Sequence, residues 1–177
     1  GTPYFNYFSN YIFLLPASEF SIQPDAGQIY RYTQAKAIHT GFEFYAEYHI
    51  IENLHIEASS EYLYNLNLDS YLPLPFTPPP SVSFSTEYES AKKIKKLNEL
   101  ALGAELKYYF AQNRTDRNEL QTPAYKLLSV SISTQVKVTK NLCVEIYFKA
   151  HNLLNEKYLN HISRYRLLNI PEQGRNF

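Results

Sequence analysis

Five histidines and one cysteine are the side chains of this sequence best suited to hold a metal ion: His39, His49, His55, Cys143, His151 and His161. His49 and His55 flank the short stretch IEN at 51–53, so a tight turn there would bring the two rings close together. Metal binding also needs convergent ligand geometry and supporting partners, which spacing alone does not supply. From the sequence we therefore expect no metal site and no cofactor site.

Catalytic motifs are missing from the sequence as well. It contains no GxSxG, HExxH, Walker A or GxGxxG pattern. Cys143 is the only cysteine, which excludes an intrachain disulfide and a thiolate cluster, and its parity places it on a polar strand face. Seventeen Lys and Arg balance seventeen Asp and Glu, whereas nucleic-acid binders usually carry a basic excess. We predict neither an enzyme nor a nucleic-acid partner.

The elements that position these side chains are predicted by a strict alternation of apolar and polar residues. In 142–150, for example, Val144, Ile146 and Phe148 alternate with Glu145 and Tyr147. A period of two indicates β-strands with one apolar and one polar face, because a helix would need spacings of three and four. The same pattern occurs in six segments: 42–50, 54–64, 82–89, 100–110, 128–138 and 142–150. A seventh strand is expected at about 4–14 with mixed parity, and 28–41 is expected to extend the strand at 42–50.

Strand length and connection length both favour a membrane. A strand that crosses a bilayer needs about 9–11 residues, against about 5–6 for an average soluble strand. Short connections at about 51–53, 90–98 and 139–141 alternate with long ones at about 15–27, 65–79 and 111–123, with a long segment after 151. Outer-membrane barrels have short periplasmic turns and long extracellular loops. The predicted fold is therefore all-β, an antiparallel up-and-down meander of about seven long strands that forms an open, partial transmembrane β-barrel.

The alternation also assigns the two faces of the predicted wall. Even-numbered residues such as Leu102 and Ile146 are expected to face lipid, and odd-numbered polar residues to face the lumen. Tyr and Phe together make up 16% of the chain, and aromatic side chains collect at membrane interfaces. Those expected to form the interfacial girdles are Tyr62, Tyr64, Tyr88, Tyr108 and Phe110.

Residues 151–177 read HNLLNEKYLNHISRYRLLNIPEQGRNF, and this run resembles the TonB-dependent receptor family. That family commonly shows an Asn-Leu pair followed by a further Asn and a Tyr, then H-x-S-R and P-E-x-G-R-N segments. The matching positions here are Asn152, Leu153, Asn155 and Tyr158, then His161, Ser163 and Arg164, then Pro171, Glu172, Gly174, Arg175 and Asn176. Gly41 with Glu43 resembles the family's G-x-E, and Pro78 to Pro80 its proline-rich return before a descending strand.

The resemblance implies an outer-membrane receptor for active uptake of a scarce nutrient, such as a ferric siderophore, haem, cobalamin, another metal complex or a glycan. It implies partnership with the TonB system through a plug domain, with outer-membrane lipid and with an extracellular ligand. Residues 1–177 would be the C-terminal segment of the barrel, without the plug. The sequence has no Met, and GRNF would open the family's last strand, so we expect a piece that ends just before the closing strand.

Two alternatives fit the alternation without the family. A small self-contained outer-membrane barrel with a porin-like role would need an eighth strand after 151. A soluble ligand-binding barrel would point its apolar face inward. Three short stretches also have a plain structural interpretation: NLLNEKY as a polar turn, KKIKK as a solvated turn, and PPP as a rigid strand start.

Overall fold

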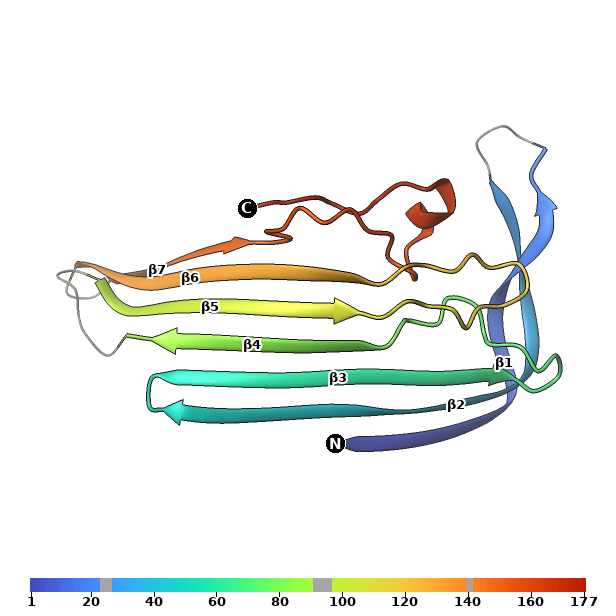
Figure 1. Ribbon diagram of the computed structural model, residues 1–177, viewed down its shortest axis with the longest axis horizontal. Coiled ribbons are helices and arrows are strands. Elements are labelled where there is room, and N and C mark those ends of the chain that lie inside the picture. Colours follow the sequence, from blue (N-terminus) through green and yellow to red (C-terminus); the bar gives the residue numbers. More distant parts are fainter. Residues whose placement is uncertain (23–26, 91–96, 140–141) are drawn as a thin grey trace.

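The chain forms one antiparallel sheet in which every strand pairs with its neighbours in sequence (Figure 1). The computed structural model describes residues 1–22, 27–90, 97–139 and 142–177. Within them lie seven strands and one short 3-10 helix. Their bounds are β1 Thr2–Phe20, β2 Gln28–Ile51, β3 Leu54–Asn67, β4 Ser81–Glu89, β5 Leu97–Tyr109, β6 Tyr125–Thr139, β7 Leu142–Ala150 and η1 Arg164–Leu168.

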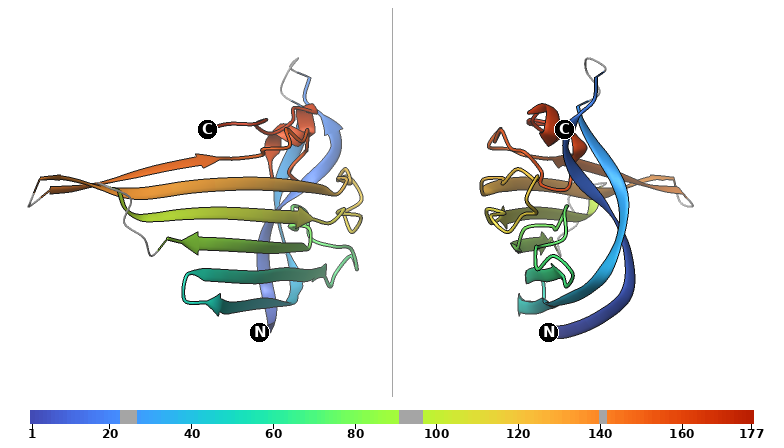
Figure 2. Two further views of the ribbon diagram at one scale, coloured as in Figure 1. Left: turned by 60° about the vertical axis from the view of Figure 1, so that its left-hand side comes forward. Right: turned by 90° about the vertical axis from the view of Figure 1, so that its right-hand side faces the viewer.

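The predicted meander is confirmed, and so is its open form, because β1 and β7 are the two edges of the sheet and do not pair. Figure 2 shows that the sheet is curled, and that the outer parts of β1 and β2 sweep past the ends of the other strands. The long strand expected from joining 28–41 to 42–50 is β2, which has 24 residues. Sequential antiparallel pairing with right-handed twist gives this curvature.

The pairing of β1 explains the mixed parity of its sequence and shows that its predicted end was wrong. The register between β1 and β2 shifts by one residue between Phe8 and Tyr11, so the alternation changes face at that bulge. A loop was expected from residue 15, but β1 continues to Phe20 and Pro16 pairs with Tyr30. Within the described sheet β1 pairs only with β2, so the missing N–H of Pro16 disturbs no ladder on its other side.

The connections alternate in length as expected. The β2–β3 turn occupies only Glu52 and Asn53, whereas residues 68–80 and 110–124 form long connections at the opposite end of the sheet. We call these the turn end and the loop end. The predicted solvated turn KKIKK, residues 92–96, and most of the turn at 139–141 lie outside the described residues.

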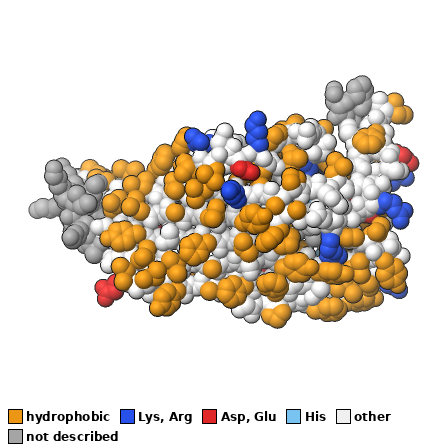
Figure 3. Space-filling view, viewed as in Figure 1, with side chains coloured by type: hydrophobic (Ala, Val, Ile, Leu, Met, Phe, Trp, Pro, Cys, Tyr) orange, Lys and Arg blue, Asp and Glu red, His pale blue; other side chains and the backbone are white. Residues whose placement is uncertain are grey.

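The two faces of the sheet differ in the way the alternation predicts. On one face Phe84, Leu106 and Leu128 follow one another across β4, β5 and β6, and on the other Ser85, Glu105 and Ser129 do. Figure 3 shows one side of the molecule, with hydrophobic side chains over most of the sheet and few acidic ones. No helix in the described part of the chain is long and apolar enough to span a membrane.

Large apolar side chains on the even-numbered face are left open. Ile146 is 54% exposed, Phe84 51% and Leu102 45%. A soluble protein rarely exposes so broad an apolar surface, so this face needs lipid or another apolar cover. The odd-numbered face is the hollowed one, because a cavity of about 430 Å³ lies on it, lined by residues such as Glu57, Ser85 and Glu105. These observations argue against a soluble barrel, which would enclose its apolar side.

The segment after β7 folds back over the loop end. His151 and Asn176 form an isolated antiparallel bridge, with the His151 N–H donating to Asn176 O at 2.9 Å. Between them the chain makes turns and η1, and within the described residues it contributes no eighth strand. A self-contained small barrel would require that strand.

Candidate functional site

The loop end is held together by a buried carboxylate in the loop 110–124. Glu119 Oε1 accepts hydrogen bonds from Arg166 Nη2 at 2.6 Å and from the Phe76 N–H at 2.8 Å. His161 Nε2 lies 3.2 Å from the same oxygen. His161 and the Glu119 and Arg166 side chains are at most 2% exposed. This cluster, which we call the Glu119 clasp, joins three long segments of the loop end.

Supporting contacts fix the two basic partners of the clasp. Arg166 Nη1 donates to the carbonyl oxygen of Leu120 at 2.9 Å, and His161 Nδ1 lies 3.0 Å from Thr122 Oγ1. Burial alone would raise the pKa of Glu119. The adjacent His161 imidazole, the Phe76 N–H and the positive charge of Arg166 outweigh it and hold the pKa of Glu119 below its usual value. The carboxylate is therefore kept ionised against its burial.

The same loop also contacts the strands and hairpins around it. Gln112 Nε2 donates to the carbonyl oxygen of Thr77 at 3.0 Å. Arg114 lies over the Tyr64 ring, with its guanidinium carbon 3.8 Å from the ring centroid. Asn118 Nδ2 donates to Pro16 O at 3.2 Å, which reaches the β1–β2 hairpin. Residues 110–124 thus connect all the long segments of the loop end.

The family-like residues after β7 build a turn. Asn152 has a positive φ of 50° and is 4% exposed. Its Oδ1 accepts from the Glu156 N–H at 2.8 Å, and its Nδ2 donates to the carbonyls of Glu156 and Gln173 at 2.9 and 3.2 Å. Asn tolerates the left-handed region better than most residues, and its amide replaces missing backbone partners. Asn152 therefore ties the start of the segment to its return.

Two further motif residues complete that turn. Asn155, with φ 54°, accepts at Oδ1 from the Arg175 N–H at 3.0 Å. The Tyr158 ring stacks on Tyr125 with centroids 4.4 Å apart, and Tyr125 stacks on Tyr109 at 4.6 Å. The motif that the sequence predicted as a polar turn is a turn, and it anchors the C-terminal segment onto β5 and β6.

A cavity of about 750 Å³ opens at the loop end, beside the clasp. Tyr30, Phe76 and Arg164 lie in its lining, together with apolar residues from the β1–β2 hairpin and η1: Leu14, Phe20, Leu167 and Leu168. Its size is that of a pocket for a small molecule, and its mixture of aromatic, aliphatic and cationic groups suits a partly anionic organic ligand.

The five histidines lie in four different places. His39 is on the polar face of β2, against the Phe8 and Tyr11 rings at 5.1 and 4.7 Å. His49 and His55 meet at the β2–β3 turn, as their spacing predicted. His151 Nδ1 lies 3.2 Å from Ser129 Oγ, and His161 is in the clasp. Cys143 is an exposed free thiol opposite Lys137.

Sequence reasoning missed Glu119 and Arg166. Their partners are 42 to 47 positions away, so no local spacing marks them. Of the three clasp residues only His161 was singled out, as a possible metal ligand and through the resemblance. The buried charges were recognisable only after the loops had been brought together.

The fold and the two opposite faces define a stretch of transmembrane barrel wall with ordered loops at one end. Residues 2–153 match the family described as "TonB dependent receptor-like, beta-barrel", and the chain belongs to that family. A solved structure titled "Copper transporter OprC" has a similar fold, with a TM-score of 0.76 and 21% sequence identity. The alignment covers 98% of this chain and 26% of that one. A search of curated proteins found no match.

Family membership confirms the resemblance seen in the sequence. The matched family is one of receptor barrels, not of enzymes. The chain spans about a quarter of the length of the solved relative, so the activity of the whole protein is a matter for proposal.

Proposed function

We propose that residues 1–177 are the C-terminal segment of the barrel of a TonB-dependent receptor that imports a scarce metal complex across the outer membrane. The observation that carries this proposal is the family match over residues 2–153, together with the strand alternation that separates an apolar from a polar face. In this role the loop end is extracellular and the turn end periplasmic. The plug domain of the full-length receptor would provide the contact with TonB.

Ferric siderophores, haem and cobalamin are the ligand classes that the family suggests, and a copper complex joins them because the solved relative is titled a copper transporter. The loop-end cavity supports an organic ligand, since aromatic rings such as Tyr30 and Phe76 lie in its wall beside Arg164. Arg164 would pair with anionic groups of such a ligand. The cavity is therefore the proposed first contact of the ligand with this part of the receptor.

A gene deletion tests the proposal. Cells that lack the full-length receptor should lose accumulation of one of these complexes, supplied with a labelled metal, and cells that lack TonB should lose it equally. Restoring the full-length gene should restore accumulation. Equal accumulation of every complex in deleted and intact cells would count against uptake.

Residue variants connect that activity to the cavity. Arg164→Gln should weaken binding of the identified complex to the purified full-length receptor by about tenfold to a hundredfold, since one charge-assisted contact contributes about 1.5–3 kcal/mol. Lys126→Gln is the matched control, because Lys126 is an exposed cation of β6 outside the cavity. If both variants bind like wild type, the ligand contacts another part of the receptor.

A further inference from the structure

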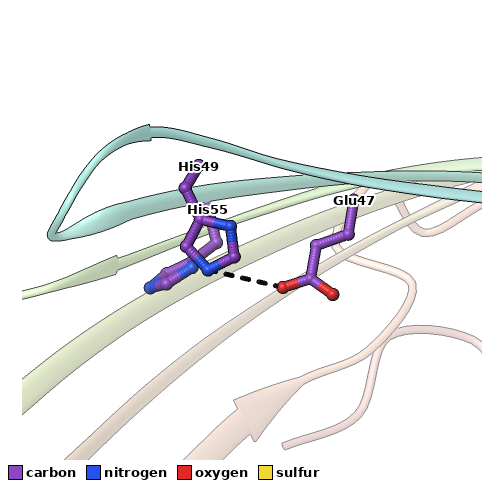
Figure 4. A group of neighbouring side chains, drawn as sticks. All are labelled: Glu47, His49 and His55. Carbon is purple, nitrogen blue, oxygen red and sulfur yellow. Dashed lines mark ion pairs between the residues drawn. The ribbon is translucent and has the colours of Figure 1, made fainter.

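The turn end carries a second group of side chains that the uptake proposal does not use. His49 of β2 and His55 of β3 are directly opposed in the register, and their ring centroids are 4.3 Å apart with an interplanar angle of 79°. Glu47 precedes His49 by two residues and so points to the same face (Figure 4). One potential ligand atom from each of the three side chains lies within 4.8 Å of the other two.

The geometry of these three side chains is close to that of a metal site. His49 Nε2 and Glu47 Oε1 are 3.6 Å apart, the pair marked by the dashed line in Figure 4. Ligands about 2.0–2.2 Å from a tetrahedral Zn²⁺ ion lie about 3.4 Å from one another. To bind one ion, the two ligand atoms that are farthest apart would have to approach each other by about 1 Å or a little more. Rotation of exposed side chains can supply this movement, because the side chains of His49 and Glu47 are 56% and 41% exposed.

The donor types select the class of ion. Two imidazole nitrogens and one carboxylate oxygen suit Zn²⁺ or Cu²⁺, whereas Ca²⁺ and Mg²⁺ prefer an all-oxygen shell. Three protein ligands leave a fourth position for water, as in zinc sites that exchange their outer ligand. A fourth coordination position would therefore be left open to water.

The surroundings favour a cation and orient the carboxylate. Tyr45 Oη donates to Glu47 Oε2 at 3.2 Å, which leaves Oε1 for the metal. The adjoining cavity of about 430 Å³ is lined by Glu47 and His55 and by four further carboxylates with a single Lys, namely Glu57, Glu87, Glu89, Glu105 and Lys149. Such a surplus of negative charge raises the local concentration of divalent cations.

We propose that Glu47, His49 and His55 form an exchangeable binding site for one divalent transition-metal ion on the lumen face at the turn end. The spacing of the two histidines did not predict a metal site, because it left out Glu47, the third ligand. The site is at the opposite end of the sheet from the loop-end cavity. Metal binding at this site requires neither TonB nor the imported ligand, so it can be tested independently of the uptake proposal.

Calorimetric titration of Zn²⁺ into the metal-free full-length receptor in detergent tests this site. Wild type should bind one more Zn²⁺ ion than His49→Ala/His55→Ala, and Glu47→Gln should weaken that ion by about tenfold or more. His151→Ala and Glu61→Gln are the controls, because His151 and Glu61 are an exposed histidine and an exposed carboxylate outside the cluster. Both should keep the wild-type number of ions and their affinity.

Paramagnetic resonance with one equivalent of Cu²⁺ identifies the ligands. Wild type should show coupling to two imidazole nitrogens, and His49→Gln or His55→Gln should show the loss of one. These conservative variants retain a polar side chain at an exposed strand end, and heat-modifiable mobility on a gel verifies that each barrel is folded. Equal Zn²⁺ stoichiometry and affinity in wild type and the folded double variant would overturn the proposal, as would a copper spectrum unchanged by both single variants.

Discussion

Arg166 Nη2 donates to Glu119 Oε1 at 2.6 Å, although the two residues are 47 positions apart in the sequence and both side chains are only 2% exposed. This ion pair closes the loop end over the barrel wall. It fixes the loop 110–124 against η1 and against Phe76, whose N–H donates to the same oxygen. The position of the loop-end cavity depends on this pair, because Phe76 and residues of η1 line it.

Removing the carboxylate should release the loops. Glu119→Gln leaves Arg166 buried without a counter-charge, which typically costs about 3–5 kcal/mol. We expect faster amide hydrogen exchange in 110–124 and 160–170, while β3 to β6 keep their protection. The control is Glu19→Gln, which breaks the Arg31–Glu19 pair whose side chains are 65% and 62% exposed, and it should cost at most about 1 kcal/mol. Unchanged exchange in Glu119→Gln would contradict the role of the clasp.

The clasp should also weaken in acid. The folded-state pKa of Glu119 lies below its usual value of 4.5, so the folded state binds this proton less readily than the unfolded chain. Its contribution is complete above about pH 4.5 and is lost as the pH falls through the folded-state pKa. Proteolysis of the loops in wild type should rise below pH 4.5.

The same proteolysis in Glu119→Gln should lack that component. Comparing the two proteins separates the effect of Glu119 from that of its neighbour Asp116. Burial raises the pKa of Asp116, so its contribution to stability increases as the pH falls. Identical pH profiles for wild type and Glu119→Gln would show that this carboxylate does not control the loops.

Substitution of Asn152 should destabilise the barrel for two reasons: its side chain makes hydrogen bonds, and its backbone has a positive φ. Asn152→Ala removes three part-buried hydrogen bonds and leaves at φ 50° an Ala, which tolerates the left-handed region less well than Asn does. Together these should cost about 2–4 kcal/mol. Asn152→Gly removes the bonds but permits the positive φ, so its cost should be smaller by about 1 kcal/mol. Urea titration of the full-length barrel, with folded protein scored by gel mobility, measures both, and a Gly variant worse than Ala would reverse this assignment.

Replacing Gly41 by Ala should disturb the barrel, whereas replacing Gly103 by Ala should not. A Cβ at Gly41 would meet the carbonyl oxygen of Tyr62, which is backbone, and also the Tyr4 ring. A Cβ at Gly103 would meet only the Ser131 hydroxyl at close range, and that group can rotate away. Gly41→Ala should therefore reduce the amount of assembled barrel in the outer membrane, whereas Gly103→Ala should assemble almost normally. Equal assembly of the two would indicate that β2 and β3 separate easily at this point.

A charge on the lipid-facing side of a strand should impair assembly much more than a charge at the next residue, which points to the other face. Ile146→Arg and Leu102→Arg place a cation on the apolar face, at an expected cost of about 2–4 kcal/mol near the bilayer midplane. Tyr147→Arg is the matched control, because Tyr147 is the next residue of β7, points to the opposite face, and is 60% exposed against 54% for Ile146. Equal folded yields for Ile146→Arg and Tyr147→Arg would be inconsistent with the facing.

Strand order and the division into an apolar and a polar face were predictable because each depends on neighbouring residues. The alternation through Val144, Ile146 and Phe148 indicates which side of the strand is apolar, and recognising it requires no knowledge of distant contacts. The expected end of β1 at about residue 14 was wrong, because the pairing with β2 continues through Pro16 to Phe20. Mixed parity in the same strand was visible, but its cause, the bulge between Phe8 and Tyr11, appears only in the pairing with β2.

The sites were less predictable than the wall. The His49–His55 contact followed from a two-residue turn, whereas the Glu119 clasp depends on three loops meeting in space. Asn152 was recognised by resemblance, yet its function as a turn anchor required the positions of Glu156 and Gln173. Long-range polar contacts of this kind leave no period in the sequence.

The assignment of one face to lipid and the other to the lumen is tested most directly by spin labels placed one at a time along 142–150 of the full-length receptor in bilayers. Collisions with oxygen, which concentrates in lipid, should peak at positions 144, 146 and 148. Collisions with a water-soluble nickel chelate should peak at 145, 147 and 149. Loss of this two-residue alternation, or its inversion, would contradict the transmembrane wall.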